Sequence, residues 1–207
     1  KGVIIPSSLL EMWKILKILV ENNKIILIQA SNTSLTGGST PNGKYDRDLF
    51  IINTLKLSNI ILINNAKQVI ALPGSTLYSL ESKLKKFQRA PHSEIGSSCI
   101  GASIVGGICN NSGGALIKRG PAYTELALYA KVNKKGKLEL VNNLDINLGN
   151  SPEKILSNLD KGNIPSTKLF KTKRKASSLD YKKVIKNIDA NSPARYNADT
   201  KRLYEAS

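Results

Sequence analysis

Short runs of apolar residues alternate along the chain with stretches in which apolar residues recur every three or four positions. The short runs predict buried strands, and the longer period predicts helices that bury one face. The predicted strands cover residues 3–5, 24–28, 49–53, 59–63, 68–72, 124–132 and 137–141. The predicted helices cover residues 8–21, 98–110 and 151–159, with another that begins near Thr76. This mixture indicates an α+β fold.

Local signals mark several of these boundaries. Ser8 followed by Glu11 is typical of a capping box at a helix start. Ser151 followed by Pro152 indicates an N-cap with proline in the first helical position. Beyond Gly162 the chain is polar and basic, and it predicts a linker or lid with one short helix over residues 181–188.

The chain carries a net charge of +16, from 31 basic and 15 acidic residues. Such an excess attracts the phosphates of lipids, nucleic acids or cofactors. The densest basic run, Lys168–Lys175, is compatible with an anionic lipid contact, although a solvated loop is the favoured interpretation. The lysine excess accompanies heavy use of Asn and Ile, which indicates compositional bias, so nucleic acid is not an expected partner. No apolar run approaches the roughly 18 residues of a membrane span.

Two cysteines, Cys99 and Cys109, provide neither a disulfide framework nor a zinc cluster. We expect reduced thiols in a cytosol-facing protein, packed as small apolar residues rather than placed against a cofactor.

Two glycine-rich stretches, residues 29–41 and 96–114, are rich in Ser, Thr and Asn. Glycine lets the backbone approach a ligand closely, and exposed N–H groups with short polar side chains bind anions. The two stretches therefore predict a phosphorylated cofactor.

Two common phosphate motifs are excluded. Gly101 and Gly106 have the spacing of a nucleoside-triphosphate loop, but Gly107 and Ile108 stand where Lys and Ser or Thr are required. Neither stretch has the Gly-x-Gly-x-x-Gly fingerprint followed by an acidic residue that the Rossmann fold uses.

Residues 29–41 resemble the pyrophosphate loop of the PCMH-type flavin domain shared by the vanillyl-alcohol-oxidase-like flavoenzymes, and the run from Gly96 to Ser103 resembles the wall that encloses the rest of the FAD. Five longer segments together resemble the bacterial respiratory, quinone-dependent D-lactate dehydrogenases: residues 28–43, 91–101, 106–114, 119–125 and 192–199.

The resemblance implies an FAD-binding domain of two α/β lobes with FAD between them. We expect the N-terminal lobe over residues 1–54, the second lobe over 55–162, and a basic linker or lid over 163–207. Both ends of the sequence look cut, so we expect a fragment of a longer chain whose substrate domain lies outside it.

By the same resemblance, one group of residues would hold the FAD pyrophosphate: Ala30, Ser31, Asn32, Thr33, Ser34, Gly38 and Ser39. Gly96, Ser103 and Gly113 would line the remainder. Relatives that tether FAD covalently use a histidine in this loop, and residues 29–41 contain none, so we expect noncovalent binding.

Ser34 and Gly37 depart from the family pattern, which has glycine and an acidic residue at these positions. If the position of Ser34 needs a positive φ, a serine there carries strain of order 1 kcal/mol, which Gly37 would relieve.

His92 is the sole histidine and a candidate base for a hydroxy acid, but a turn that bridges backbone groups is the favoured interpretation. The catalytic residues are not assigned. The groups that hold the substrate carboxylate are expected in the later domain.

The implied activity is oxidation of D-lactate to pyruvate, with electrons passed to quinone, by a peripheral protein on the cytoplasmic face of the bacterial inner membrane. One alternative is another FAD-linked hydroxy-acid or alcohol oxidoreductase. A second is a cofactor-free basic module that binds anionic membranes or nucleic acid.

Overall fold

The computed structural model describes residues 1–91, 101–110, 112 and 126–166. Its strands are β1 (Gly2–Ile4), β2 (Ile25–Gln29), β3 (Leu49–Asn53), β4 (Ile60–Ile63), β5 (Gln68–Ala71), β6 (Leu128–Val132) and β7 (Leu138–Asn142). Its helices are α1 (Leu9–Glu21), α2 (Leu77–Lys85), α3 (Ile104–Cys109) and α4 (Pro152–Asp160).

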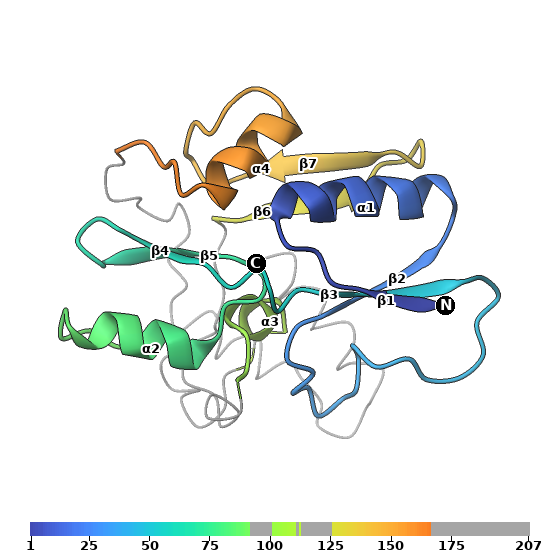
Figure 1. Cartoon of the computed structure of the whole chain (residues 1–207), viewed down its shortest axis with the longest axis horizontal. Coiled ribbons are helices and arrows are strands. Elements are labelled where there is room, and N and C mark those ends of the chain that lie inside the picture. The colour runs from blue at the N-terminus through green and yellow to red at the C-terminus, as the bar shows by residue number, and fades with distance from the viewer. Residues whose placement is uncertain (92–100, 111, 113–125, 167–207) are drawn as a thin grey trace, which may run out of the picture.

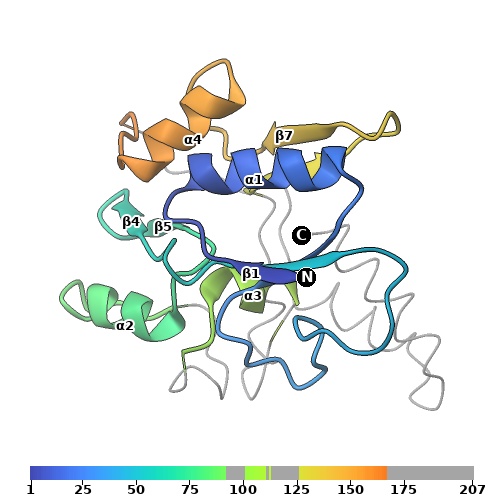
Figure 2. The ribbon, with the colours of Figure 1, turned by 45° about the vertical axis from the view of Figure 1, so that its right-hand side comes forward.

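The first sheet is parallel, in the order β1-β3-β2, and its register aligns Ile4, Ile52 and Ile28. β4 and β5 form an antiparallel pair, as do β6 and β7. α1 lies on one side of the parallel sheet, with the β6–β7 hairpin and α4 beyond it (Figure 1). α3 and the loop after β2 lie on the opposite side of the sheet, as the turned view also shows (Figure 2). The first glycine-rich stretch and the described part of the second, residues 101–110, therefore lie on the same side of the sheet.

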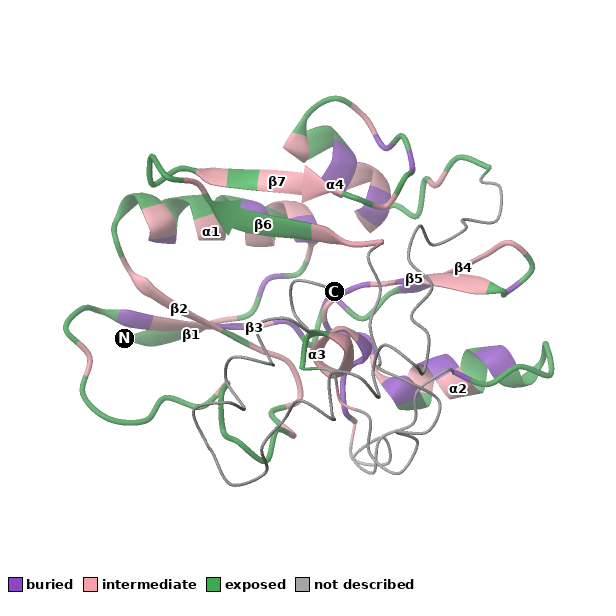
Figure 3. Ribbon diagram, turned by 180° about the vertical axis from the view of Figure 1, so that it is seen from behind, coloured by how far each residue is buried: buried purple, intermediate pink, exposed green. Residues whose placement is uncertain are grey.

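Two apolar clusters hold these layers together. The first joins α1, β5 and α4 through buried side chains that include Trp13, Leu72, Leu148 and Leu159. The second packs α2 against β4 and the start of α3, through Leu77, Leu80, Leu84, Ile60 and Ala102. The buried turns of α2 and α4 stand out from the largely exposed strand β6 (Figure 3).

Two acidic side chains fix the N-terminus of α1. The Ser8 hydroxyl accepts a hydrogen bond from the Glu11 N–H at 3.0 Å, as predicted. A capping box also requires the Glu11 side chain to accept from the Ser8 N–H, and this half of the prediction is wrong. Glu11 Oε2 instead accepts from the N–H and the hydroxyl of Ser7, each at 2.6 Å. These bonds from Ser7 lower the pKa of Glu11. Asp160 of α4 accepts from the N–H groups of Leu9 and Leu10 at 2.8 and 3.1 Å.

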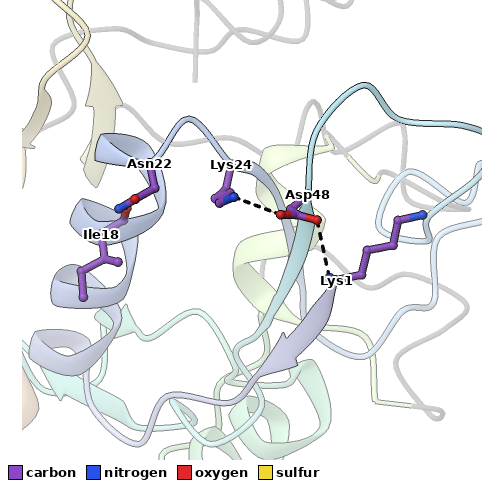
Figure 4. Close-up of polar contacts among 5 residues, drawn as sticks. All are labelled: Lys1, Ile18, Asn22, Lys24 and Asp48. Atoms are coloured by element: carbon purple, nitrogen blue, oxygen red, sulfur yellow. Dashed lines mark hydrogen bonds and ion pairs between the residues drawn. The ribbon is translucent and has the colours of Figure 1, made fainter.

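The turn between α1 and β2 is held at the opposite end of the sheet from the glycine-rich loops. Lys24 Nζ lies 3.0 Å from Asp48 Oδ2 (Figure 4). The Ile25 N–H also donates to the Asp48 carbonyl. The Lys24 ammonium lowers the pKa of Asp48. The Asn22 side chain also donates to the Ile18 carbonyl at 2.8 Å, which ends α1.

The third helix is shorter than predicted. Gly101 has a φ of +90°, which a helix does not allow, and Ser103 is the N-cap, so α3 begins at Ile104. β6 begins at Leu128, later than the predicted 124. The predicted helix over residues 181–188, the basic run Lys168–Lys175 and most of the predicted linker lie outside the described residues.

The prediction that Cys109 packs as a small apolar residue is wrong. The cysteine is exposed at the end of α3 rather than packed in a core, and it is a free thiol. Partial desolvation raises its pKa, so the thiol stays protonated near neutral pH. Cys99 lies outside the described residues. Among the described helices, none has the length and apolarity that crossing a membrane requires.

Candidate functional site

The first glycine-rich loop begins where two parallel strands end side by side. Gln29 ends β2 opposite Asn53, the last residue of β3. Gln29 Nε2 donates to the Ser39 carbonyl at 2.9 Å, which closes the loop over ten residues. The Thr54 N–H donates to the Gln29 carbonyl at 2.9 Å, so the loop is anchored to the sheet.

Inside the loop, Asn32 organises the turn. Its backbone is left-handed, with φ +54°, and its side-chain oxygen accepts from the hydroxyls of Ser39 and Thr40 at 2.7 and 2.9 Å. Gly37 is also left-handed, at φ +66°, whereas Ser34 is not. Ser34 therefore does not carry the backbone strain that a positive φ would cause. The left-handed positions of the loop are occupied by Asn and Gly, the residue types that tolerate this conformation best.

The loop presents backbone donors that have no partner among the described residues. Within the described part of the chain, no acceptor receives the N–H groups of Asn32, Thr33, Ser34, Gly38 and Ser39. A row of such N–H groups in a turn forms a concave binding surface for an anion. The donor set therefore suits a pyrophosphate.

The space around Gly38 also points to a ligand. A Cβ at this position would lie 3.9 Å from the nearest neighbour, Thr36 Oγ1, and its backbone is not left-handed. The packing of the described residues therefore does not require glycine here. A ligand that approaches the backbone would use the space that a side chain fills.

The second glycine-rich stretch is tied to the turn before α2. The Leu77 N–H donates to the Ala102 carbonyl at 3.0 Å, and the Ile104 N–H donates to the Ser75 carbonyl at 2.9 Å. The Ser103 hydroxyl is buried and accepts from the Gly106 N–H at 3.1 Å, so it caps α3.

The two loops are joined by a hydrogen bond that the Ser31 hydroxyl donates to the Gly101 carbonyl. Of the ten predicted site residues, seven lie in the first loop, and Ser103 is the N-cap of α3, two residues after Gly101. Gly96 and Gly113 lie outside the described residues, as does His92.

Thr54 and the Pro73-Gly74 turn form a buried junction between the two loops, which the sequence did not predict. Thr54 is fully buried, and its hydroxyl lies 3.3 Å from the Pro73 carbonyl oxygen. A Cβ on Gly74 would overlap the carbonyl of Thr54 and lie 2.9 Å from Leu55 Cα. Pro73-Gly74 looks like an ordinary turn in the sequence. Its close packing on Thr54 depends on a contact that no local pattern encodes.

The fold agrees with the comparison to known families. Residues 1–140 match the family of FAD binding domains, and the chain belongs to that family. The chain is 56% identical over all 207 residues to the quinone-dependent D-lactate dehydrogenase of Escherichia coli strain K12, and 47% identical over the same length to that of Corynebacterium glutamicum. It spans 36% of the length of each of these two relatives.

Solved structures support the fold. Alkyldihydroxyacetonephosphate synthase superposes with a TM-score of 0.54 at 15% identity, covering 74% of this chain and 28% of its own. The 6-hydroxy-D-nicotine oxidase of Arthrobacter nicotinovorans gives 0.53 at 15% identity, covering 70% of this chain and 31% of its own. The fold is thus the α+β, PCMH-type FAD-binding domain, as predicted, and FAD is the cofactor.

Proposed function

We propose that this chain is the FAD-binding part of an enzyme that oxidises D-lactate to pyruvate and passes the electrons to quinone. The observation that carries the proposal is the 56% identity over the whole chain to a quinone-dependent D-lactate dehydrogenase. The unused donors of the loop after β2 support it, because they suit the phosphates of the cofactor.

Residues 30–34, 38 and 39 are proposed to hold the FAD pyrophosphate through backbone N–H groups. Each hydrogen bond to a charged acceptor contributes roughly 1.5–3 kcal/mol, so several of them retain the cofactor without a covalent bond. Residues 29–41 contain neither histidine nor cysteine to form such a bond. Precipitation of the holoprotein with acid should leave the flavin in the supernatant.

When bound, FAD supplies a two-electron acceptor for the alcohol carbon of the substrate. The role of this chain is to position that cofactor. Ser31 joins the loop after β2 to Gly101, and Ser103 caps the short helix that follows. We also propose that residues 1–54 and 55–162 form the two lobes of the FAD-binding domain. The groups that bind the lactate carboxylate would lie in a substrate domain to which residues 163–207 lead.

We also infer that the protein acts at the cytoplasmic face of the bacterial inner membrane, as a peripheral protein. The net charge of +16 supports attraction to an anionic lipid surface. A quinone that dissolves in the bilayer is reached from that surface.

The test is anaerobic reduction of the flavin in the protein expressed at its native length. D-lactate should bleach the flavin absorbance, and L-lactate should bleach it at least tenfold more slowly. Adding a soluble quinone should restore the colour. Bleaching by glycolate or 2-hydroxyglutarate but not by D-lactate would assign the chain to another hydroxy-acid oxidoreductase. A purified protein without flavin would favour the basic-module alternative.

A further inference from the structure

The loop after β2 is exposed, and side chains hold its base. Residues 34–38 are all exposed. Gln29 Nε2 donates to the Ser39 carbonyl at 2.9 Å, and Asn53 Nδ2 donates to the Ala30 carbonyl at 3.4 Å. Both bonds lie within the first lobe, so neither fixes where the loop lies relative to the second glycine-rich stretch.

Ser31 makes a contact of a different kind. Its hydroxyl donates to the carbonyl of Gly101, which is 70 residues further along the chain. Gly101 has a left-handed backbone, with φ +90°, and a Cβ added there would lie 3.8 Å from the Ser31 hydroxyl oxygen. The bond therefore joins the exposed loop to a turn whose shape favours glycine.

The acceptor of this bond is firmly held. Ala102, the next residue, is 1% exposed, and its carbonyl accepts from the Leu77 N–H at 3.0 Å. The Ile104 N–H donates to the Ser75 carbonyl at 2.9 Å, so the chain on both sides of the N-cap of α3 is bonded to the turn before α2. The Gly101 carbonyl is thus a fixed point against which the loop can be set.

The contacts between the two stretches close a ring. The Thr54 N–H donates to the Gln29 carbonyl at 2.9 Å, and Gly74 packs against the Thr54 carbonyl. The turn that contains Gly74 is bonded to the stretch that begins at Gly101, and Ser31, two residues after Gln29, completes the ring. Ser31 contributes a side chain, so its bond can be removed without altering a backbone group.

The Ser31 hydroxyl is also a donor with a single proton. A proton donated to the Gly101 carbonyl is not available to a phosphate oxygen. The bond joins two groups of the protein, so it does not need a cofactor in order to form. The side chain of Ser31 is therefore engaged within the protein, which leaves its backbone to face a ligand.

We propose that Ser31 is a positioning residue for FAD. Its hydroxyl holds the loop after β2 against the Gly101 turn, and it keeps the N–H groups of the loop in place before the cofactor arrives. A site that is already ordered loses less conformational entropy on binding, so it holds its ligand more tightly. The inference rests on the pyrophosphate site proposed above and names a side chain that sets how tightly that site holds FAD.

The first measurement is the dissociation rate of FAD from the native-length holoprotein. Ser31→Ala should release FAD about fivefold faster than the native protein, which is the factor that one neutral hydrogen bond contributes. Ser31→Thr keeps the hydroxyl and should stay within twofold of the native rate. The matched control is Thr36→Ala, which removes a hydroxyl that contacts Ser34 within the same loop, and it should also stay within twofold.

The second measurement is the urea denaturation midpoint of the same proteins after the flavin has been removed. Because the Ser31 bond forms without a cofactor, Ser31→Ala should lower the midpoint, whereas Ser31→Thr and Thr36→Ala should leave it unchanged. A hydroxyl that binds a phosphate would alter the FAD dissociation rate alone. A hydroxyl with a purely structural role would alter the midpoint alone.

The role of Ser31 would be overturned by FAD release at the native rate in Ser31→Ala, by an unchanged midpoint in that variant, or by a Ser31→Thr variant that behaves like Ser31→Ala. Neither measurement uses lactate, so a native protein that D-lactate does not bleach would overturn the proposed substrate and leave this role intact. Full flavin content in Gly38→Val would overturn the pyrophosphate site on which the role depends.

Discussion

At the scale of single residues, two glycines have different physical reasons to be glycine. Gly38 lies in the exposed loop with open space where a side chain would be, whereas Gly74 packs against the backbone of Thr54. A substitution at Gly38 tests the ligand, and a substitution at Gly74 tests the fold.

Gly38→Val should abolish flavin retention and leave the folded protein intact. The added side chain would occupy the space of a phosphate oxygen, but its Cβ would meet no atom of the described residues closer than 3.9 Å. We expect flavin content to fall at least tenfold, with the free energy of unfolding of the flavin-free protein changed by less than about 0.5 kcal/mol. Leu35→Val, at a fully exposed position of the same loop, is the control and should keep its flavin. Full flavin content in Gly38→Val would reject the loop assignment.

Gly74→Ala should destabilise the protein whether or not flavin is bound. Its Cβ would overlap the carbonyl of Thr54, and both backbones are buried, so relief requires the junction to move. Overpacking of this kind costs about 1–3 kcal/mol, which urea denaturation measures. Gly38→Ala is the control. An unchanged denaturation midpoint in Gly74→Ala would show that the junction is looser than described.

At the scale of elements, the N-terminus of α1 depends on α4. Asp160→Asn keeps one acceptor but removes the charge and one of the two hydrogen bonds to Leu9 and Leu10. We expect a loss of about 1–2 kcal/mol in the free energy of unfolding. Asp145→Asn removes the same charge at an exposed left-handed position, where asparagine is well tolerated, and should have little effect. Similar losses in both variants would argue against the cap.

Glu11 gives this helix a pH dependence. Hydrogen bonds from Ser7 lower its pKa in the folded state, so the carboxylate stabilises the fold above its ordinary pKa. That contribution is lost as the pH falls through the lowered pKa. Thermal unfolding at a series of pH values should therefore show Glu11→Gln less stable than the native protein near neutral pH, with the difference shrinking in acid. A constant difference would contradict the role assigned to Ser7.

The elements themselves were predictable because their periodicity is local. Ser8, Thr76 and Ser151 each cap a helix, and the sequence indicated all three helix starts. The sequence could not predict the cap from Asp160, which is 151 residues away from Leu9. The sequence also predicted too long a helix over residues 98–110, because small residues are compatible with a helix. The left-handed backbone of Gly101 is visible only in the structure.

At the scale of the whole molecule, the sequence predicted the cofactor class better than the site. The two glycine-rich stretches indicated a phosphorylated ligand, and the family comparison confirms FAD. The stretches touch through Ser31 and Gly101, and Thr54 packs against Gly74 between them. Both contacts depend on how segments far apart in the sequence pack together. The individual FAD contacts stay predictions.

We propose that backbone N–H groups of the loop after β2 hold the FAD pyrophosphate. Millisecond hydrogen–deuterium exchange of the native-length protein, with and without FAD, tests it most directly. FAD should slow exchange at the N–H groups of Asn32, Thr33, Ser34, Gly38 and Ser39, and it should leave exchange in the turn at Lys134–Gly136 unchanged. Equal exchange in the loop with and without bound FAD would show that these N–H groups do not hold the cofactor.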